Sequence, residues 1–116
     1  MYEIKAKPLS ANKLYTGRRY KTDDYRAYIN ELNFLLPHND EVKFNRNEDV
    51  EIMITVGLCN RMQDLDNTAK GLIDIMQAKY NFNDYHIVKL IMEKNIVKSG
   101  DEYIKFSISN ITKNYE

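Results

Sequence analysis

The sequence predicts one small α+β domain, spanning residues 1–116, in which a mixed β-sheet is accompanied by two main helices. Three observations support this fold class. The length of 116 residues is that of a single domain. The apolar fraction of 43% and the charged fraction of 29% are ordinary for a globular protein with a packed core. Apolar residues recur with strand and helix periods in the order β-α-β-α-β-β.

The first half of the chain predicts a short strand, a helix and a longer strand. The short strand lies near the N-terminus and ends before Pro8, because proline cannot donate to a β-ladder. Residues 23–36 predict a helix, since apolar residues recur at helical spacing until Pro37. Residues 50–59 predict the clearest strand, with apolar side chains at every second position.

The second half predicts a helix followed by two strands. Residues 66–80 predict the helix, and residues 81–84 form a turn after it. Strands are expected over 85–97 and 103–114, joined by a turn at 99–102. These last two strands are expected to form an antiparallel hairpin. The buried stripe of the helix is expected to contain Leu65, Ala69, Leu72, Ile73 and Met76.

Charge and cysteine content exclude several classes of protein. Seventeen basic and 17 acidic residues give a net charge of zero, unlike a protein that simply coats DNA. Cys59 is the only cysteine, which excludes a disulfide framework or a cysteine zinc site within one chain. His38 and His86 are isolated and are interpreted as surface or strand histidines. With no secretory signal and no membrane span, a cytoplasmic location is expected.

The N-terminal region is locally basic. Tyr15 and Tyr20 are interleaved with its cations, and no acid interrupts residues 5–21. Such a segment would contact a DNA backbone, and its tyrosines would stack on unpaired bases. A solvated loop is the equally simple alternative. The basic residues of this segment are Lys5, Lys7, Lys13, Arg18, Arg19 and Lys21.

The stretch "DLDNTAKGLID" concentrates acids around a lysine at the start of the second helix. Asp66, Lys70 and Asp74 lie four residues apart on one helix face, where they would form ordinary surface ion pairs. A metal site is the alternative: Asp64 and Asp66 would be joined by Asp84 from the turn before the next strand. Carboxylate oxygens suit Mg²⁺ or Mn²⁺, and Lys70 would then stabilise charge on a phosphate.

Rival motifs fit the same stretch poorly. An EF-hand loop starting at Asp64 would need glycine and glutamate where Ala69 and Ile75 stand. "DLDNT" matches the nucleophile motif of haloacid dehalogenase-like phosphatases and contains the DxD of glycosyltransferases. The chain is too short for either of those folds, and it has no glycine-rich phosphate loop.

Three segments together resemble the RusA family of Holliday junction resolvases. They are "KPLSANKLY", "DLDNTAKGLID" and "NDYHIVKL", and they span nearly the whole chain. The resemblance implies a small mixed α/β endonuclease, found in bacteria and prophages, that acts in DNA recombination and repair. It further implies a Mg²⁺-dependent homodimer, with Mn²⁺ as a possible substitute, that nicks two opposing strands of a four-way junction.

The resemblance also assigns roles to individual residues. Asp64, Asp66 and Asp84 match the catalytic aspartates that bind the metal, and Lys70 matches the catalytic lysine. Asn67 and Asp74 match supporting positions of the same motif. The residues expected to contact DNA are Lys7, Ser10, Asn12, Lys13, Tyr15, Arg18, Arg19 and Arg61.

Two departures from the family pattern keep a second interpretation open. Asn83 stands where the family often has an acid, and Arg61 is the only basic residue just before Asp64. A non-catalytic DNA-binding or regulatory protein on a nuclease-like fold is therefore the alternative. If the chain is an enzyme, paired nicks need two copies, because a four-way junction has two-fold symmetry and one chain carries one acidic cluster.

Overall fold

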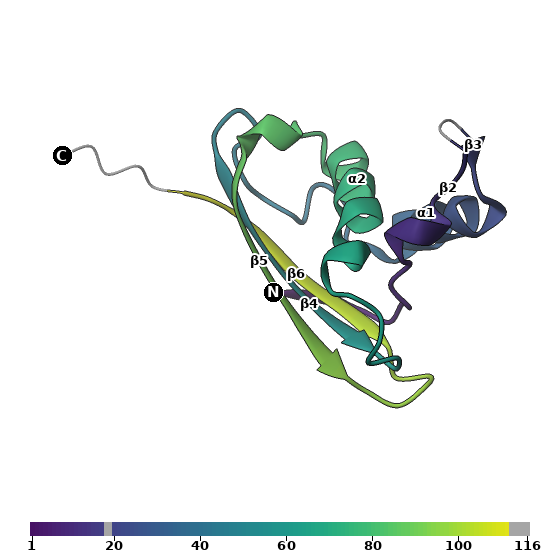
Figure 1. The fold of residues 1–116 in the computed structure, drawn as a ribbon. Coiled ribbons are helices and arrows are strands. Elements are labelled where there is room, and N and C mark those ends of the chain that lie inside the picture. The colour runs from purple at the N-terminus through teal and green to yellow at the C-terminus, as the bar shows by residue number, and fades with distance from the viewer. Residues whose placement is uncertain (18–19, 112–116) are drawn as a thin grey trace.

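The computed structural model describes residues 1–17 and 20–111, and it confirms the α+β class. Four strands form the main sheet in the spatial order β1-β6-β4-β5. Helices α1 and α2 lie on one side of this sheet (Figure 1). The strands of the main sheet are β1 (Tyr2–Ile4), β4 (Val50–Leu58), β5 (Ile87–Ile96) and β6 (Tyr103–Asn110).

The remaining elements are two helices, three short 3₁₀ turns and a two-stranded hairpin. The hairpin lies beyond α1, away from the main sheet (Figure 1). The helices are α1 (Asp23–Leu35) and α2 (Ala69–Tyr80), and the hairpin pairs β2 (Tyr15–Thr16) with β3 (Tyr20–Lys21). The 3₁₀ turns are η1 (Ala11–Lys13), η2 (Asp66–Thr68) and η3 (Asp84–His86).

Strand β4 is the centre of the sheet and of the core. It pairs in parallel with β5, with Ile52 opposite Leu90, and antiparallel with β6, with Ile52 opposite Ile108. The expected hairpin of the last two strands is therefore wrong, because β4 lies between β5 and β6. Alternation of apolar residues identifies a strand but not its neighbours, and the most apolar strand takes one of the two positions with a partner on each side.

One face of β4 supplies the middle of the core. Its alternate apolar side chains pack under the helices together with Leu72 and Met76 of α2 and Phe106 of β6. The buried stripe of α2 differs slightly from the expected one, because Ile75 and Tyr80 are buried whereas Leu65, Ala69 and Ile73 are only partly covered. The buried residues of β4 on this face are Val50, Ile52, Ile54, Val56 and Leu58.

The ends of both helices are fixed by side chains. Thr22 caps α1, since its hydroxyl accepts a hydrogen bond from the backbone N–H of Tyr25 at 3.0 Å. Lys79 of α2 donates to the carbonyl of Leu36 at 3.1 Å, which ties α2 to the end of α1. Arg46 donates from Nε to the carbonyl of Tyr80 at 2.6 Å. These contacts place positive charge at the C-terminal ends of the helices, where the helix dipole favours it.

The boundaries agree closely with the sequence prediction elsewhere. The helix expected over 66–80 is present as η2 followed by α2. The last strand ends at Asn110, and residues 112–114 of its expected range lie outside the described residues. Within residues 1–17 and 20–111, no helix has both the length and the apolar character needed to cross a membrane.

Candidate functional site

The carboxyl end of β4 leads directly into the acidic motif. After Leu58 the chain turns through residues 59–65 and enters η2 at Asp66. The side chains of Asp64, Asp66 and Lys70 are all exposed at this edge of the sheet. Two carboxylates and an ammonium are thus presented to solvent from a turn, a 3₁₀ turn and the first turn of α2.

The N-terminal motif packs beside this acidic motif. The 3₁₀ turn η1 contacts both η2 and α2. Ser10 caps η1, because its hydroxyl accepts a hydrogen bond from the backbone N–H of Asn12 at 3.3 Å. Two segments far apart in sequence therefore form one surface.

A cavity of about 320 Å³ lies between the N-terminal motif and the turn that precedes Asp64, and we call it the loop cavity. Its lining includes Lys7, Ser10 and Lys13 of the N-terminal motif and Asn60 and Gln63 of the turn after β4. Four residues of the predicted DNA contacts, counting Asn12 in η1, thus come from the segment beside Asp66.

The turn before Asp64 is held by hydrogen bonds. Lys94 of β5 donates from Nζ to the carbonyls of Arg61, at 3.2 Å, and Gln63, at 3.0 Å. The side-chain oxygen of Asn60 accepts from the backbone N–H of Met62 at 2.9 Å. The chain is thus fixed on both sides of the turn before it reaches Asp64.

The surface ion pairs expected along α2 do not form. Among the described residues, neither Asp66 and Lys70 nor Lys70 and Asp74 approach within salt-bridge distance. Leu65, and not Asp66, is the N-cap residue of η2, and Asp66 is an acid in its first turn. Asp66 and Lys70 therefore do not neutralise each other in an ion pair.

Asp74 has a separate environment. It lines a small cavity together with Tyr15 and Tyr25, between α2, α1 and the β2–β3 hairpin. Burial, and then the negative charge of Asp74, raise the pKa of Tyr25 to about 12. The Tyr15 ring packs edge-on against Tyr25 with their centroids 5.7 Å apart. Tyr25 is therefore a core residue, and Asp74 faces it.

The other predicted contacts are scattered around this edge or fall outside the description. Asn67 is partly buried within η2, and Arg61 is exposed in the turn before Asp64. Tyr15 lies in β2 and is 37% exposed. Arg18 and Arg19 lie outside the described residues.

Asp84 lies at the opposite end of the sheet. It belongs to η3, which precedes β5, whereas Asp64 and Asp66 follow the carboxyl end of β4. Because β4 and β5 are parallel, the amino end of β5 and the carboxyl end of β4 lie at opposite ends of the strands. The twelve residues of α2, about 18 Å of helix, separate the two positions.

The expected convergence of three carboxylates within one chain is therefore wrong. No group of three or more His, Cys, Asp or Glu side chains that could hold a metal ion occurs in the described parts of the chain. The physical reason is the parallel β-α-β connection. Its helix returns the chain from the carboxyl end of β4 to the amino end of β5, at the other end of the strands.

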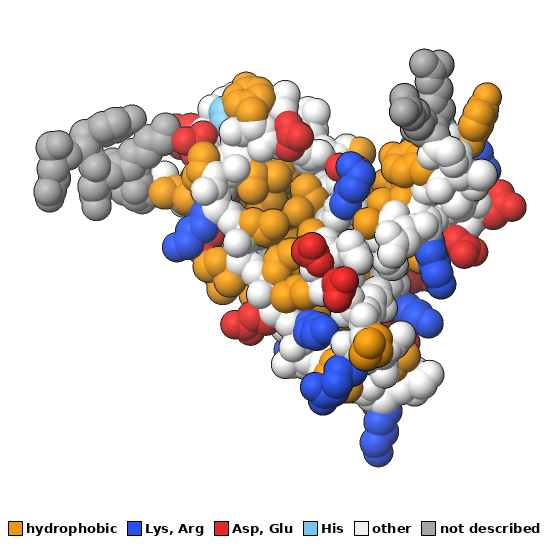
Figure 2. Space-filling view, viewed as in Figure 1, with side chains coloured by type: hydrophobic (Ala, Val, Ile, Leu, Met, Phe, Trp, Pro, Cys, Tyr) orange, Lys and Arg blue, Asp and Glu red, His pale blue; other side chains and the backbone are white. Residues whose placement is uncertain are grey.

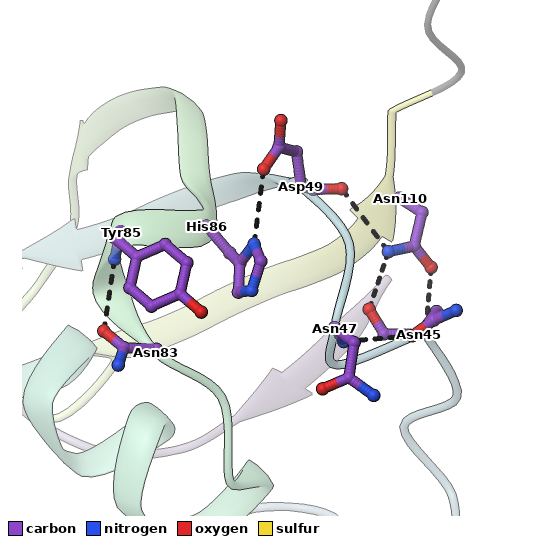
Figure 3. Close-up of polar contacts among 7 residues, drawn as sticks. All are labelled: Asn45, Asn47, Asp49, Asn83, Tyr85, His86 and Asn110. Carbon is purple, nitrogen blue, oxygen red and sulfur yellow. Dashed lines mark hydrogen bonds and ion pairs between the residues drawn. The ribbon is translucent and has the colours of Figure 1, made fainter.

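The surroundings of Asp84 contain a contact that the sequence did not reveal. The Nδ1 atom of His86 lies 3.3 Å from Oδ1 of Asp49, and only 14% of the His86 side chain is exposed (Figure 3). The Tyr85 ring packs on that of His86 with centroids 4.2 Å apart. Asn83 caps η3 by accepting from the N–H of Tyr85 at 3.3 Å. No sequence spacing signals the pair, because its members are 37 residues apart.

These contacts border a second polar cavity, of about 480 Å³, which contains Asp84. Asn47, Gln77 and Asn81 complete much of its lining. Asp84 thus lines a polar cavity that is remote from the other two aspartates.

Exposed carboxylates, a lysine and a basic segment at one sheet edge are groups that proteins use to bind and cleave phosphodiesters. The comparison with known families agrees with that class. The family model described as endodeoxyribonuclease RusA matches residues 2–106 of the 116-residue chain. The chain therefore belongs to the RusA family of endodeoxyribonucleases, which act on Holliday junction DNA. No curated protein matches the chain.

Proposed function

We propose that this protein is a Mg²⁺-dependent endonuclease that resolves Holliday junctions by paired nicks and acts as a homodimer. Membership of the RusA family supports the reaction class and the branched substrate. One structural observation supports the metal site and the homodimer. Asp64 and Asp66 follow the carboxyl end of β4, whereas Asp84 precedes β5 at the other end of the strands.

The donor set fits a hard cation, provided that two chains contribute. Asp64 and Asp66 offer exposed carboxylate oxygens, the ligand type that Mg²⁺ prefers. One chain brings only these two acids together, so Asp84 must come from a second copy. A bound Mg²⁺ would supply Lewis-acid stabilisation of the phosphate and a more acidic water. Lys70 would bind the phosphate oxygens, where its charge opposes the charge developing in the transition state.

The geometry of the sheet supports a particular dimer. Strand β5 is an edge of the sheet, and an edge strand presents unpaired backbone groups to a second chain. Three large apolar side chains of β5 are exposed, namely Val88, Leu90 and Ile96. Hydrophobic side chains gather over β5 and the neighbouring part of α2, with acidic side chains beside them (Figure 2).

A two-fold axis beside β5 would run the two β5 strands antiparallel. Each amino end would then face the carboxyl end of the partner strand. Asp84 of one copy would approach Asp64 and Asp66 of the other, and the dimer would contain two equivalent sites. Two equivalent sites match the two-fold symmetry of a four-way junction.

The basic segment supports backbone contact on the same surface. Lys7 and Lys13 line the loop cavity next to the acidic motif. Contacts of this type hold the DNA in register and carry no sequence information by themselves. The overall charge of zero is compatible with this role, because bound metal would neutralise the acids at the proposed sites and leave the rest of the chain with more basic than acidic residues.

A non-catalytic DNA-binding protein is the second candidate, and one observation favours it. A single chain does not assemble the three carboxylates, so a protein that remained monomeric would bind DNA without cutting it. Such a monomer would keep the basic surface that binds DNA but would lack a complete site for phosphodiester cleavage.

Cleavage of a labelled four-way junction tests the proposal. The wild-type protein should give paired nicks with Mg²⁺ and none with EDTA. Asp66→Asn should fold normally and retard the junction without cutting it. Asp101→Asn is the matched control, because Asp101 is an exposed acid in the β5–β6 turn. Cutting by Asp66→Asn at the wild-type rate would refute the proposed site, and metal-independent retardation without nicks by the wild type would favour the second candidate.

A further inference from the structure

The lining of the loop cavity includes amide and apolar side chains in addition to the lysines that contact with a DNA backbone requires. Lys7 and Lys13 place two ammonium groups at its margin, and Leu9 and the buried Leu58 supply apolar wall. Among the described residues, Asp24 is the only acid in the lining. A cavity whose lining combines cations with apolar side chains suits a phosphate joined to a flat ring.

Two amide side chains in the lining of the cavity have hydrogen-bonding groups without a partner among the described residues. Asn60 uses its side-chain oxygen for the N–H of Met62, and within the described residues its NH₂ group has no partner. Gln63 makes one long contact, 3.5 Å from Nε2 to the carbonyl of Pro8, and its side-chain oxygen has no partner there. Amides with a free donor and a free acceptor can distinguish base edges by their hydrogen-bonding pattern.

The wall that carries these amides is preorganised. Lys94 fixes the carbonyl of Gln63, and the backbone N–H of Gln63 donates to the carbonyl of Asn60 at 3.2 Å. A binding wall held in this way discriminates between ligands better than a mobile loop, because less ordering is needed when the ligand binds.

The position of the cavity relates it to the cleavage site. Asn60 and Gln63 belong to the turn whose next residue is Asp64, and η1, which contributes Lys13 to the lining, contacts η2, which begins at Asp66. Anything bound in the cavity would therefore be a close neighbour of the phosphate held at the aspartates.

We infer that the loop cavity binds one nucleotide of the substrate DNA, taken out of its base stack, and that Asn60 and Gln63 discriminate its base. Its phosphate lies on Lys7 and Lys13, and its base lies against Leu9 and Leu58. This inference rests on the proposed function and deepens it, because it makes the cavity the part of the site that selects where the junction is cut.

The size of the cavity favours a single nucleotide. A volume of about 320 Å³ is at the lower end of the range of roughly 300–1,000 Å³ for small-molecule sites. A base leaves its stack at least cost where pairing is already interrupted, as at the branch point of a junction. A base-selective cavity beside the carboxylates would therefore act at branch points in preference to intact duplex.

A binding experiment tests the inference without requiring cleavage. Junctions that differ only in the base at the branch point compete for the Asp66→Asn protein, which binds without cutting. With Gln63 present, the affinities of this protein for the best and the worst junction should differ by at least about fivefold. Gln63→Ala should bring the four affinities close together, whereas Lys7→Gln should weaken all four by a similar factor. Asn30→Ala, an exposed change in α1, should keep the original discrimination.

A cleavage experiment provides the second arm. On a junction whose branch point migrates through all base contexts, the wild type should cut at a restricted set of positions, and Gln63→Ala should spread the cuts. Equal affinities for the four junctions with Gln63 present, or an unchanged preference in Gln63→Ala, would overturn the inference. If the wild type binds with discrimination but never cuts, the proposed function fails while the nucleotide site stands.

Discussion

The ammonium group of Lys94, in β5, lies 3.0 Å from the carbonyl oxygen of Gln63 and 3.2 Å from that of Arg61. This contact joins the edge strand of the sheet to the turn that precedes Asp64. It therefore links the surface proposed for dimerisation to the carboxylates proposed for metal binding, and it explains how an irregular segment can present acids in a fixed geometry.

Lys94→Met should loosen that turn while keeping most of the aliphatic side chain. Loss of the charge-assisted hydrogen bonds should lower the free energy of unfolding by about 1–2 kcal/mol, measured by urea titration. Hydrogen exchange should accelerate at the amides of residues 60–65 more than in β4. Lys98→Met, at an exposed turn position, should leave both quantities unchanged. Exchange in Lys94→Met no faster than in this control would contradict a holding role for Lys94.

The stability of the fold should decrease in alkali. Burial raises the pKa of Tyr28 and Tyr80, and burial together with Asp74 raises that of Tyr25 to about 12. The unfolded phenols lose their protons first, near pH 10, so the free energy of unfolding is unaffected below about pH 9 and falls above about pH 10.

Urea titrations from about pH 8 to pH 11 measure this decrease. Its slope should be at most about 1.4 kcal/mol per pH unit for each tyrosine. Tyr25→Phe should make the slope shallower, whereas Tyr20→Phe, at a position 73% exposed, should not. A free energy of unfolding that stays constant to pH 11 would show that the buried phenols do not titrate differently in the two states.

Gly57 in β4 allows a close approach on the open face of the sheet. A Cβ atom there would overlap the ring of Tyr103 on β6, whose hydroxyl accepts a hydrogen bond from Asn95 at 2.7 Å. Gly57→Ala should therefore lower the free energy of unfolding by roughly 1–3 kcal/mol. Adding Tyr103→Ala should remove much of that penalty in a double-mutant cycle, while Ser109→Ala should add to it independently. Strictly additive effects of Gly57→Ala and Tyr103→Ala would exclude the overlap.

The sequence predicted most of the elements because their signals are local. The alternation in 50–58 and the helical spacing before Pro37 depend on neighbouring residues, and both elements occur where expected. The contact between the N-terminal motif and the acidic motif was anticipated only through the family resemblance. The structure gives it a physical form, in which η1 packs on η2.

The sequence did not predict which strands are neighbours, and the error in the site follows from that. Asp84 follows Asp64 and Asp66 along the chain, in the turn before the next strand, and the family resemblance suggested that the three form one cluster. Because β4 and β5 are parallel, the chain instead returns through α2 to the other end of the strands before Asp84. The contact between His86 and Asp49 was missed for the same reason, because it depends on which strand ends meet.

The central claim is that each site is completed by two copies of the chain. Asp66→Asn and Asp84→Asn homodimers should each be inactive, since every site then lacks a carboxylate. A mixed dimer collects both substitutions in one site and leaves the other complete, so refolding the two variants together should restore nicking of one junction strand, to about a quarter of the wild-type rate. No recovered nicking, in a mixture shown by differently tagged chains to contain mixed dimers, would contradict the shared site.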